Sequence, residues 1–542
     1  MSSVHSAQTG NIVVRNHLAA VSLFALAWAV AFPVWAQESP AAGPILPFRV
    51  EYRLRQFEGR KPLPGLQAYS ATMVDGRIVV LGGRCQGLHK FMPPPAENMP
   101  RALANSLIVV IDPATGEWWS HDVSGLSRRL ADAIRCNNQQ SWYDRETDEW
   151  YLLGGYGWDR AVDDMKTFPT LMRVSARRLI AEVTKPGPHP NQAIEALFEL
   201  QEDDRFAVTG GGLHRLGTNF YLVLGHRFDG EYRVFDPGTR KAEVNFSQKY
   251  TEEIRVFTLK PGTLEILSYG TLTSDDPTHP LHRRDGTVIG TVDPHSGEPR
   301  IAMFGGVFVP GTTQGYTAPI YIADRKNQPD FQIDSQVQQR FCQYECAVLP
   351  VHDSETRSVY HLFFGGLSHS HHGYTPIQNE VYKLVTSQKR ADGVPFVGLV
   401  GGLLQRADAS SDQFLLPEPL PQIPLPPEVM ETYFKDFPMY RVDSTNLYGA
   451  SVDLISNAEA IDRGLLGRSG VVNLSGIKPG QSVVAGYLYG SIASVFPYAL
   501  IPSQGTFPSN ALLEIRVTRE LSQTIPATEG IAAEVTTRRP GR

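Results

Sequence analysis

One short pattern recurs along the chain and constrains its fold more than any other feature. Residues 141–155 read SWYDRETDEWYLLGG, two β-rich runs joined by a polar turn and ended by Gly154-Gly155. Turn residues between two such runs predict a β-hairpin, and a glycine pair accepts positive φ and lets a second backbone come close. Related hairpins end near residues 82, 225, 305, 365 and 490. Six hairpins of one kind predict a repeat architecture.

The other five hairpins keep this pattern with small departures. They read YSATMVDGRIVVLGG (69–83), LHRLGTNFYLVLG (213–225), IAMFGG (301–306), ECAVLPVHDSETRSVYHLFFGG (345–366) and SVVAGYLYGS (482–491). The first is followed by NSLIVVIDPATGEWW (105–119), a strand, an aspartate-led turn and a strand that opens on tryptophan. These features resemble the kelch family of β-propellers. The units are spaced more widely than the kelch period of roughly 50 residues, so we expect long loops.

Longer phrases are similar to an uncharacterised group of secreted bacterial kelch-like proteins. They are FYLVLGHRFDG (220–230), QKYTEEIRVF (248–257), LHRRDG (281–286), LFFGG (362–366) and GYLYGS (486–491), and the resemblance spans about residues 48–519. It implies an all-β fold, a six-bladed kelch-type β-propeller. Seven blades stay open, because the long stretch between the last two glycine ends has room for an undetected unit. The resemblance implies no reaction, since propellers host many functions.

The ends of the repeat suggest how the ring would close. Residues 48–57, FRVEYRLRQF, alternate apolar and charged side chains as a half-buried strand does. They precede the first unit, while the last unit provides only three strands. An open ring would leave two exposed edges, so we expect the N-terminal strand to complete the last blade and close the propeller. An independent arm is the alternative.

The chain ends and one internal stretch fall outside the repeat. Residues 1–36 combine Arg15, an apolar run and Val34-Trp35-Ala36, which predicts a cleaved signal peptide and export to the periplasm or medium. An uncleaved anchor is the alternative, and no later segment is apolar enough to span a membrane. We expect the propeller over 37–519. A proline-rich insertion at about 405–440 could instead be a linker, and the tail 520–542 is expected to be disordered.

The net charge and the cysteine positions bear on nucleic-acid binding, disulfide bonds and zinc sites. The formal net charge of −6 argues against a nucleic-acid binder, which needs a basic face. An exported chain can keep disulfides. Cys85 follows one glycine pair and Cys136 begins the next unit, so we predict that these two pair, with free thiols as the alternative. Cys342 and Cys346 could form a second bridge if a turn separates them. No CxxC spacing indicates a zinc site, and no cofactor is expected.

Candidate site residues lie at strand starts and just after glycine pairs, which in a propeller converge on the axis. An acidic ligand such as a uronate or sialate could be held by Arg84, Arg135, His282, Arg283 and Arg284. Tyr344, Glu345 and His282 could act as acid and base. His369 and His371 are weak metal candidates. The plainer alternatives are ties between blades, hydrogen-bonded core groups and an exposed polar loop.

Two function classes remain. The first is an exported propeller that binds a protein or a glycan through its long loops. The second is a carbohydrate-directed enzyme, an epimerase, lyase or oxidase, with its site on the axis. The sequence shows no hydrolase, phosphate-loop or zinc-protease motif, which favours the first class. A deep polar funnel holding an acid–base pair would favour the second.

Overall fold

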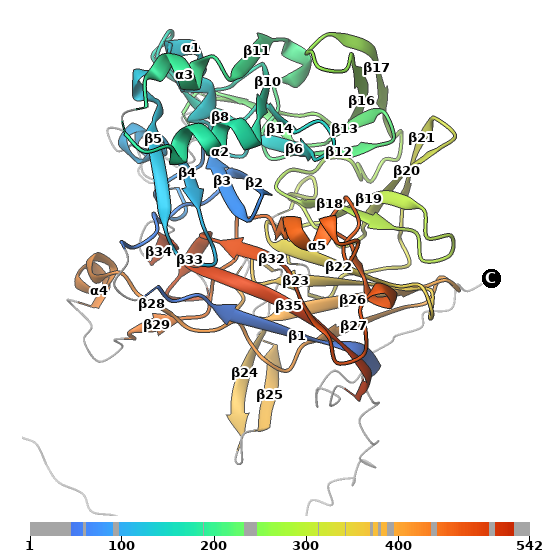
Figure 1. Cartoon of the computed structure of the whole chain (residues 1–542). Helices are drawn as coiled ribbons and strands as arrows, with labels where there is room; N and C mark the ends of the chain where they lie inside the picture. Colours follow the sequence, from blue (N-terminus) through green and yellow to red (C-terminus); the bar gives the residue numbers. More distant parts are fainter. Residues whose placement is uncertain are drawn as a thin grey trace, which may run out of the picture. The chain divides into compact units, whose positions relative to one another are not determined.

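The chain is built from antiparallel β-strands, most of them in sheets of four (Figure 1). The structure, a computed structural model, describes residues 45–57, 61–89, 97–187, 189–231, 246–312, 314–341, 343–368, 372–377, 381–386, 395–434, 442–497 and 505–524. All of these belong to one compact unit, Ala41–Arg542. The predicted signal peptide, residues 1–36, lies outside the described residues. Within the described ranges no helix combines the length and the apolar character needed to cross a membrane.

Six sheets, here called sheets 1 to 6, follow one another along the sequence. Sheet 1 comprises β2 (Ser70–Val74), β3 (Arg77–Leu81), β4 (Leu107–Ile111) and β5 (Trp118–Asp122). Sheet 2 comprises β6 (Gln140–Asp144), β7 (Glu149–Leu153), β10 (Thr170–Ser175) and β11 (Phe198–Glu202). Sheet 3 comprises β12 (Gly212–Leu216), β13 (Asn219–Val223), β16 (Ile254–Leu259) and β17 (Ile266–Leu272). Sheet 4 comprises β18 (Thr287–Val292), β19 (Pro299–Phe304), β20 (Ile320–Arg325) and β21 (Gln328–Ile333).

Sheets 5 and 6 complete the series. Sheet 5 comprises β22 (Ala347–Asp353), β23 (Ser358–Phe364), β26 (Val400–Arg406) and β27 (Ser411–Leu415), with β31 (Val472–Asn473) parallel to β22. Sheet 6 comprises β30 (Ile455–Ser456), β32 (Ser482–Tyr489), β35 (Leu512–Thr524) and β1 (Ile45–Leu54). The six predicted hairpin ends all fall where the second strand of one of these sheets stops.

The double glycines are explained by contacts between consecutive sheets. Both residues of each pair have positive φ, for example 60° and 93° at Gly154 and Gly155. In five of the six pairs, among the described residues, the second N–H donates to a backbone carbonyl just before the first strand of the next sheet, as in Gly155 N to Val208 O at 2.8 Å. The same bond runs from Ser491 N, in sheet 6, to Leu66 O, just before sheet 1, at 2.8 Å. Sheet 6 is therefore joined to sheet 1 as sheet 2 is joined to sheet 3.

The apolar core lies between consecutive sheets, because alternate residues of a strand point to opposite faces. In β19, Ile301 and Met303 pack with sheet 3, while Ala302 and Phe304 pack with sheet 5. A further cluster joins sheets 5, 6 and 1. The first strands also adjoin one another, from β2 through β6, β12 and β18 to β22, and β30 lies against β2. This arrangement is consistent with a propeller.

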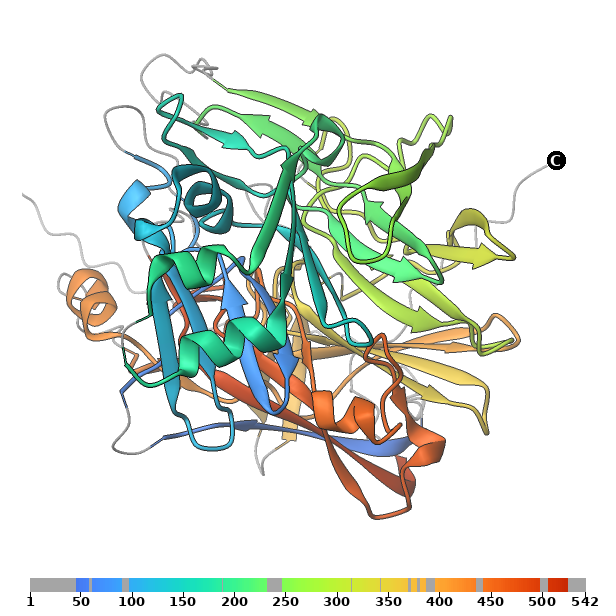
Figure 2. The same cartoon turned by 45° about the horizontal axis from the view of Figure 1, so that its top comes forward.

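The N-terminal strand pairs as the sequence predicted. β1 runs antiparallel to β35, with Val50 opposite Val517 and Leu54 opposite Leu513. Figures 1 and 2 show this blue strand alongside the red strands of sheet 6. Phe48 is fully buried and meets the Tyr360 ring edge-on at 5.0 Å, so β1 also contacts sheet 5. β35 continues through Thr524, past residue 520 where the tail was expected, and residues 525–542 lie outside the described residues.

Connections between the sheets carry further elements. A seventh four-stranded sheet, not predicted, is formed by β8 (Tyr156–Asp159), β9 (Asp164–Thr167), β14 (His226–Asp229) and β15 (Ser247–Tyr250). The α-helices of the described residues are α1 (Arg128–Ile134), α2 (Ala176–Thr184), α3 (Asn191–Glu195), α4 (Pro427–Phe434) and α5 (Ala458–Asp462). Two-stranded ribbons are β24 (His372–Ile377) with β25 (Val381–Thr386), β28 (Ile423–Pro424) with β29 (Ser444–Thr445), and β33 (Ile492–Ser494) with β34 (Thr506–Pro508).

The proline-rich stretch packs against sheets 5 and 6. Leu416, Leu420, Ile423 and Leu425 are all buried in the cluster that these sheets share. Residues at 405–406 and 411–415 already belong to strands of sheet 5. The described part of this stretch is therefore held by buried apolar contacts.

The predicted disulfide between Cys85 and Cys136 is wrong. Cys85 is a free, exposed thiol and Cys136 is a free, buried one. Cys136 Sγ lies beside Gly157 of its own unit and donates to Asp132 O at 3.5 Å. Cys136 follows α1, in the buried connection to β6. Cys342 lies outside the described residues.

Candidate functional site

Six residues with left-handed backbone form a ring where the first strands begin. They are Ala68, Asn138, Gly210, Asp285, Glu345 and Ser451, with φ between 48° and 63°. Backbone hydrogen bonds join the first four in sequence: Asn138 N donates to Ala68 O at 2.9 Å, Gly210 N to Asn138 O at 3.4 Å, and Asp285 N to Gly210 O at 2.7 Å. Ala68 N donates in turn to Ser451 O at 2.8 Å, which connects the last unit to the first. One residue from each unit is thus brought to a common centre.

Two adjoining cavities lie at this centre and share Gln139, Gly211, Gly286 and Asp453 in their walls. The inner cavity, about 80 Å³, is lined by the ring residues and by Tyr69. The outer cavity, about 230 Å³, lies between the first strands of all six sheets. We call the two together the central cavity. Its walls come from six segments that are far apart in the sequence.

Three carboxyl groups face the inner cavity. Burial, together with the neighbouring Asp285, raises the pKa of Glu345 to about 8, and Ser451 Oγ donates a hydrogen bond to Glu345 Oε2 at 3.2 Å. Asp285 forms an ion pair with Arg284. Asp453 is exposed to the water of the cavity, and desolvation by the protein that surrounds the cavity raises its pKa to about 6. At neutral pH these environments favour a protonated Glu345 and an ionised Asp453.

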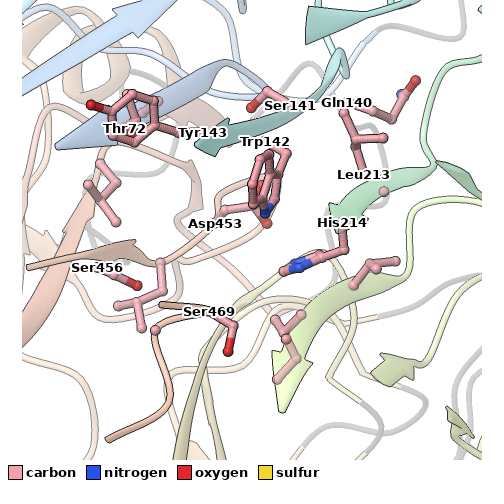
Figure 3. A pocket seen from close by; sticks show the side chains of 18 of the residues that line it. Thr72, Gln140, Ser141, Trp142, Tyr143, Leu213, His214, Asp453, Ser456 and Ser469 are labelled. Carbon is pink, nitrogen blue, oxygen red and sulfur yellow. The ribbon is translucent and has the colours of Figure 1, made fainter. Parts of the chain in front are cut away.

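The outer cavity combines an indole with small polar groups (Figure 3). Trp142, from β6, is half-buried and held edge-on against Phe220 at 5.7 Å. His214, from β12, has a pKa lowered to about 4 by burial, so its imidazole is neutral at pH 7. Ser469 lies beside it because Gly290 has no side chain: a Cβ at Gly290 would come within 2.4 Å of Ser469 Cβ.

Cationic groups at the outer cavity are matched by acids. Arg145 donates to Asp462 Oδ1 at 3.1 Å and to Met73 O at 3.1 Å. Arg468 forms an ion pair with Glu146. These guanidinium groups are therefore neutralised locally, and the central cavity keeps the polarity set by its carboxyl, hydroxyl and amide groups.

Two of the five predicted anion-binding residues, Arg84 and Arg283, donate to backbone carbonyls. Arg84 is buried and donates to Pro100 O at 2.7 Å and to Gln86 Oε1 at 2.6 Å, and burial lowers its pKa to about 10. Arg283 is buried and donates to the carbonyls of Pro280, Gly305 and Ala318. Arg135 lies at the end of α1. None of these three lines the central cavity.

The remaining predicted residues divide between the centre and its surroundings. Glu345 lies in the ring, whereas Tyr344 is a buried core residue packed with Leu367 and Phe396. His282 stacks on Tyr250 at 3.7 Å, and its Nδ1 lies 2.6 Å from Glu252 Oε1. The weak metal candidates His369 and His371 lie outside the described residues.

Sequence reasoning missed Trp142, His214 and Asp453. Trp142 and His214 lie on predicted first strands, and the aromatic residues at 142–143 indicate a β-strand without indicating a site. Asp453 had no such signal, because β30 is only two residues long. In each unit, a residue before the first strand forms a β-bridge with the residue that follows the glycine pair; in the sixth unit this residue is Ala450. Asp453 lies three residues after Ala450, so only an alignment of the six units on this bridge could find it.

Comparisons with known proteins do not identify a family for this chain. No family model matches the chain, and no curated protein matches it. Among solved structures it is similar to the protein YjhT, with a TM-score of 0.43 and 9% identity over 83% of this chain and 95% of that one. A likeness this distant carries no inference about function.

Proposed function

We propose that this chain is an exported, six-bladed kelch-type propeller that acts on carbohydrates by acid–base chemistry in its central cavity. The observation that carries the proposal is the central cavity itself. Six first strands line it, and it holds two carboxyl groups whose surroundings favour opposite protonation states. A protonated acid and an ionised base in one site are the elements of proton transfer to and from a bound molecule.

The propeller proposal is supported by the repeated contacts between units. Each of the six hairpins ends at a residue that bridges to the start of its own unit, such as Arg84 with Gln67 and Ile492 with Ala450. The hydrogen bonds from Ser491 to Leu66 and from Ala68 to Ser451 join the last unit to the first. β1 would be the outermost strand of the sixth blade and would close the ring. Export rests on the segment 1–36.

The lining of the cavity favours an uncharged, polyhydroxylated ligand. An indole offers an apolar face to the C–H groups of a sugar ring, while carboxylate, hydroxyl and amide groups accept and donate hydrogen bonds to its hydroxyls. An anionic sugar would meet the ionised Asp453, and the guanidinium groups described at the cavity, those of Arg145 and Arg468, are already paired with acids. For this reason we propose a neutral carbohydrate in place of the uronate or sialate suggested by the arginines.

Binding without turnover is the second candidate. The aromatic and polar lining accounts for carbohydrate binding by itself, and the long connections, including the sheet of β8, β9, β14 and β15, offer further surface for a glycan or protein partner. In that case the raised pKa of Glu345 would be a consequence of burial alone.

The test uses neutral mono- and oligosaccharides with the full mature chain. Binding is followed by saturation-transfer NMR, and chemistry by incubation in D₂O, since an epimerase or lyase that moves a proton at carbon introduces deuterium there. Deuterium incorporation that is lost in Asp453→Asn and Glu345→Gln supports the enzyme. Binding with no incorporation supports the second candidate. Binding that is unchanged in Trp142→Ala and Asp453→Asn refutes the central cavity as the site.

A further inference from the structure

The inner cavity contains more carboxyl groups than the nearby cation can neutralise. Asp285 and Glu345 are neighbours in the ring, and both have limited exposure. Among the described groups that act on Glu345, the cationic one is Arg284, whose guanidinium is bound by Asp285. With both carboxyls ionised the group would carry a net charge of −1 in a poorly solvated place, which is costly. With one proton added, the group is neutral.

The geometry decides which carboxyl holds that proton. Arg284 Nη1 pairs with Asp285 Oδ2, and Arg284 Nε lies 3.2 Å from Tyr250 Oη, so the guanidinium is oriented toward Asp285 from β15 as well. Glu345 has a neutral partner, the Ser451 hydroxyl. Burial raises the pKa of Asp285, but its ion pair with Arg284 opposes that rise. Glu345, whose partner is neutral, is therefore the carboxyl less able to hold a negative charge.

We propose that Glu345 carries a proton in the resting protein at neutral pH, and that Arg284, through its ion pair with Asp285, is the positioning residue that keeps it there. The use of this proton as the acid of the site rests on the proposed function. The protonation itself does not. The charged groups that face Glu345 are Asp285 and Arg284 before β18 and Asp453 before β30.

Infrared spectroscopy of the full mature chain in D₂O tests the proposal without a ligand. A protonated carboxylic acid has a C=O stretching band that is separate from the bands of carboxylates. The parent protein should show this band at pD 7 and lose it as pD rises through about 8, the value to which burial raises the pKa of Glu345. Glu345→Gln should lack the band.

Asp285→Asn supplies the decisive comparison. It leaves Glu345 intact but frees the Arg284 charge, so Glu345 should ionise and the band should disappear. Arg284→Gln should show a larger band, because both carboxyls then lack a cation. Asp453→Asn is the matched control and should keep the parent band at pD 7.

A parent protein without the band at pD 7 overturns the proposal. So does an Asp285→Asn variant that keeps the band at full intensity, because protonation would then owe nothing to the ion pair. The pD titration of the parent protein decides the first point even if a variant fails to fold. The expected band pattern in a protein that binds no carbohydrate would refute the proposed function and support this inference.

Discussion

The close contact between consecutive sheets predicts that alanine at Gly154 strongly destabilises the protein. This residue is buried with φ of 60°, and a Cβ built on it would lie 2.0 Å from Val208 O and 2.8 Å from Phe206 O. Gly217 has almost the same φ, 57°, but is exposed, and a Cβ there would meet nothing within 4 Å. Alanine at the two positions therefore separates the cost of the backbone angle from the cost of the close approach.

The expected magnitudes follow from these two settings. Gly217→Ala should destabilise the protein by about 1–2 kcal/mol, the cost of a left-handed conformation for a residue with a Cβ. Gly154→Ala adds the displacement of the next sheet, about 1–3 kcal/mol for overpacking. It also endangers the bond from Gly155 N to Val208 O, and a buried group without a partner costs about 1–3 kcal/mol. We expect Gly154→Ala to cost at least about 2 kcal/mol more than Gly217→Ala.

Urea unfolding followed by tryptophan fluorescence and circular dichroism measures both variants, with thermal melting as a second readout. The two probes must give the same midpoints for the free energies to be compared. If the two variants lose stability equally, to within about 1 kcal/mol, the glycine pairs are required for their φ values alone. The argument that they hold consecutive sheets together would then be refuted.

Four further predictions concern the N-terminal strand, the central cavity and export. Deleting 45–54 should expose β35 and its partner edges and give an aggregating protein by light scattering; a soluble monomer with an unchanged melting temperature would show that the strand is dispensable. Trp142→Ala should weaken carbohydrate binding by calorimetry by about 1–2 kcal/mol, while Trp118→Ala, on an outer strand, should not. Glu345→Gln should become more stable relative to the parent as pH rises from 5 to 8, by roughly 2–4 kcal/mol. Burial raises the pKa of this acid to about 8, so its contribution is fully present below pH 4.5 and is lost as pH rises; an equal pH dependence would contradict this. N-terminal sequencing of exported protein should begin near Gln37, and an intact Met1 in membranes would contradict cleavage.

The hairpins and the N-terminal strand could be predicted because their signals are local. A turn such as Asp75-Gly76 between two β-rich runs needs positive φ at both positions, and the structure has 48° and 77° there. The alternation in residues 48–57 likewise reflects one buried face of β1. Contacts between distant segments leave no local pattern in the sequence. The predicted Cys85–Cys136 disulfide was therefore wrong, and the sheet containing β8 and β14 was not predicted.

The candidate site depends on such distant contacts. Arginines next to the glycine pairs suggested an anion site, but a charge in the sequence does not tell whether it reaches a cavity or a backbone carbonyl. Arg283 fills the second role, with three carbonyl partners. Glu345 was considered only as a weak acid–base candidate, because its environment is created by Asp285 and Ser451, which come from two other units.

The ring shows how a repeated backbone can hold a non-repeated site. Its six positions share one backbone conformation but present six different side chains, from Gly210 to Glu345. Glycine adopts this conformation without cost, and asparagine and aspartate adopt it more readily than other residues. Glutamate has no such advantage, so its backbone at φ of 53° is held by the surrounding units and contributes nothing favourable by itself. A residue that is costly to the backbone, and whose carboxyl group is costly to bury, is placed where six units meet. Both costs are consistent with a position determined by what the carboxyl group does in the cavity.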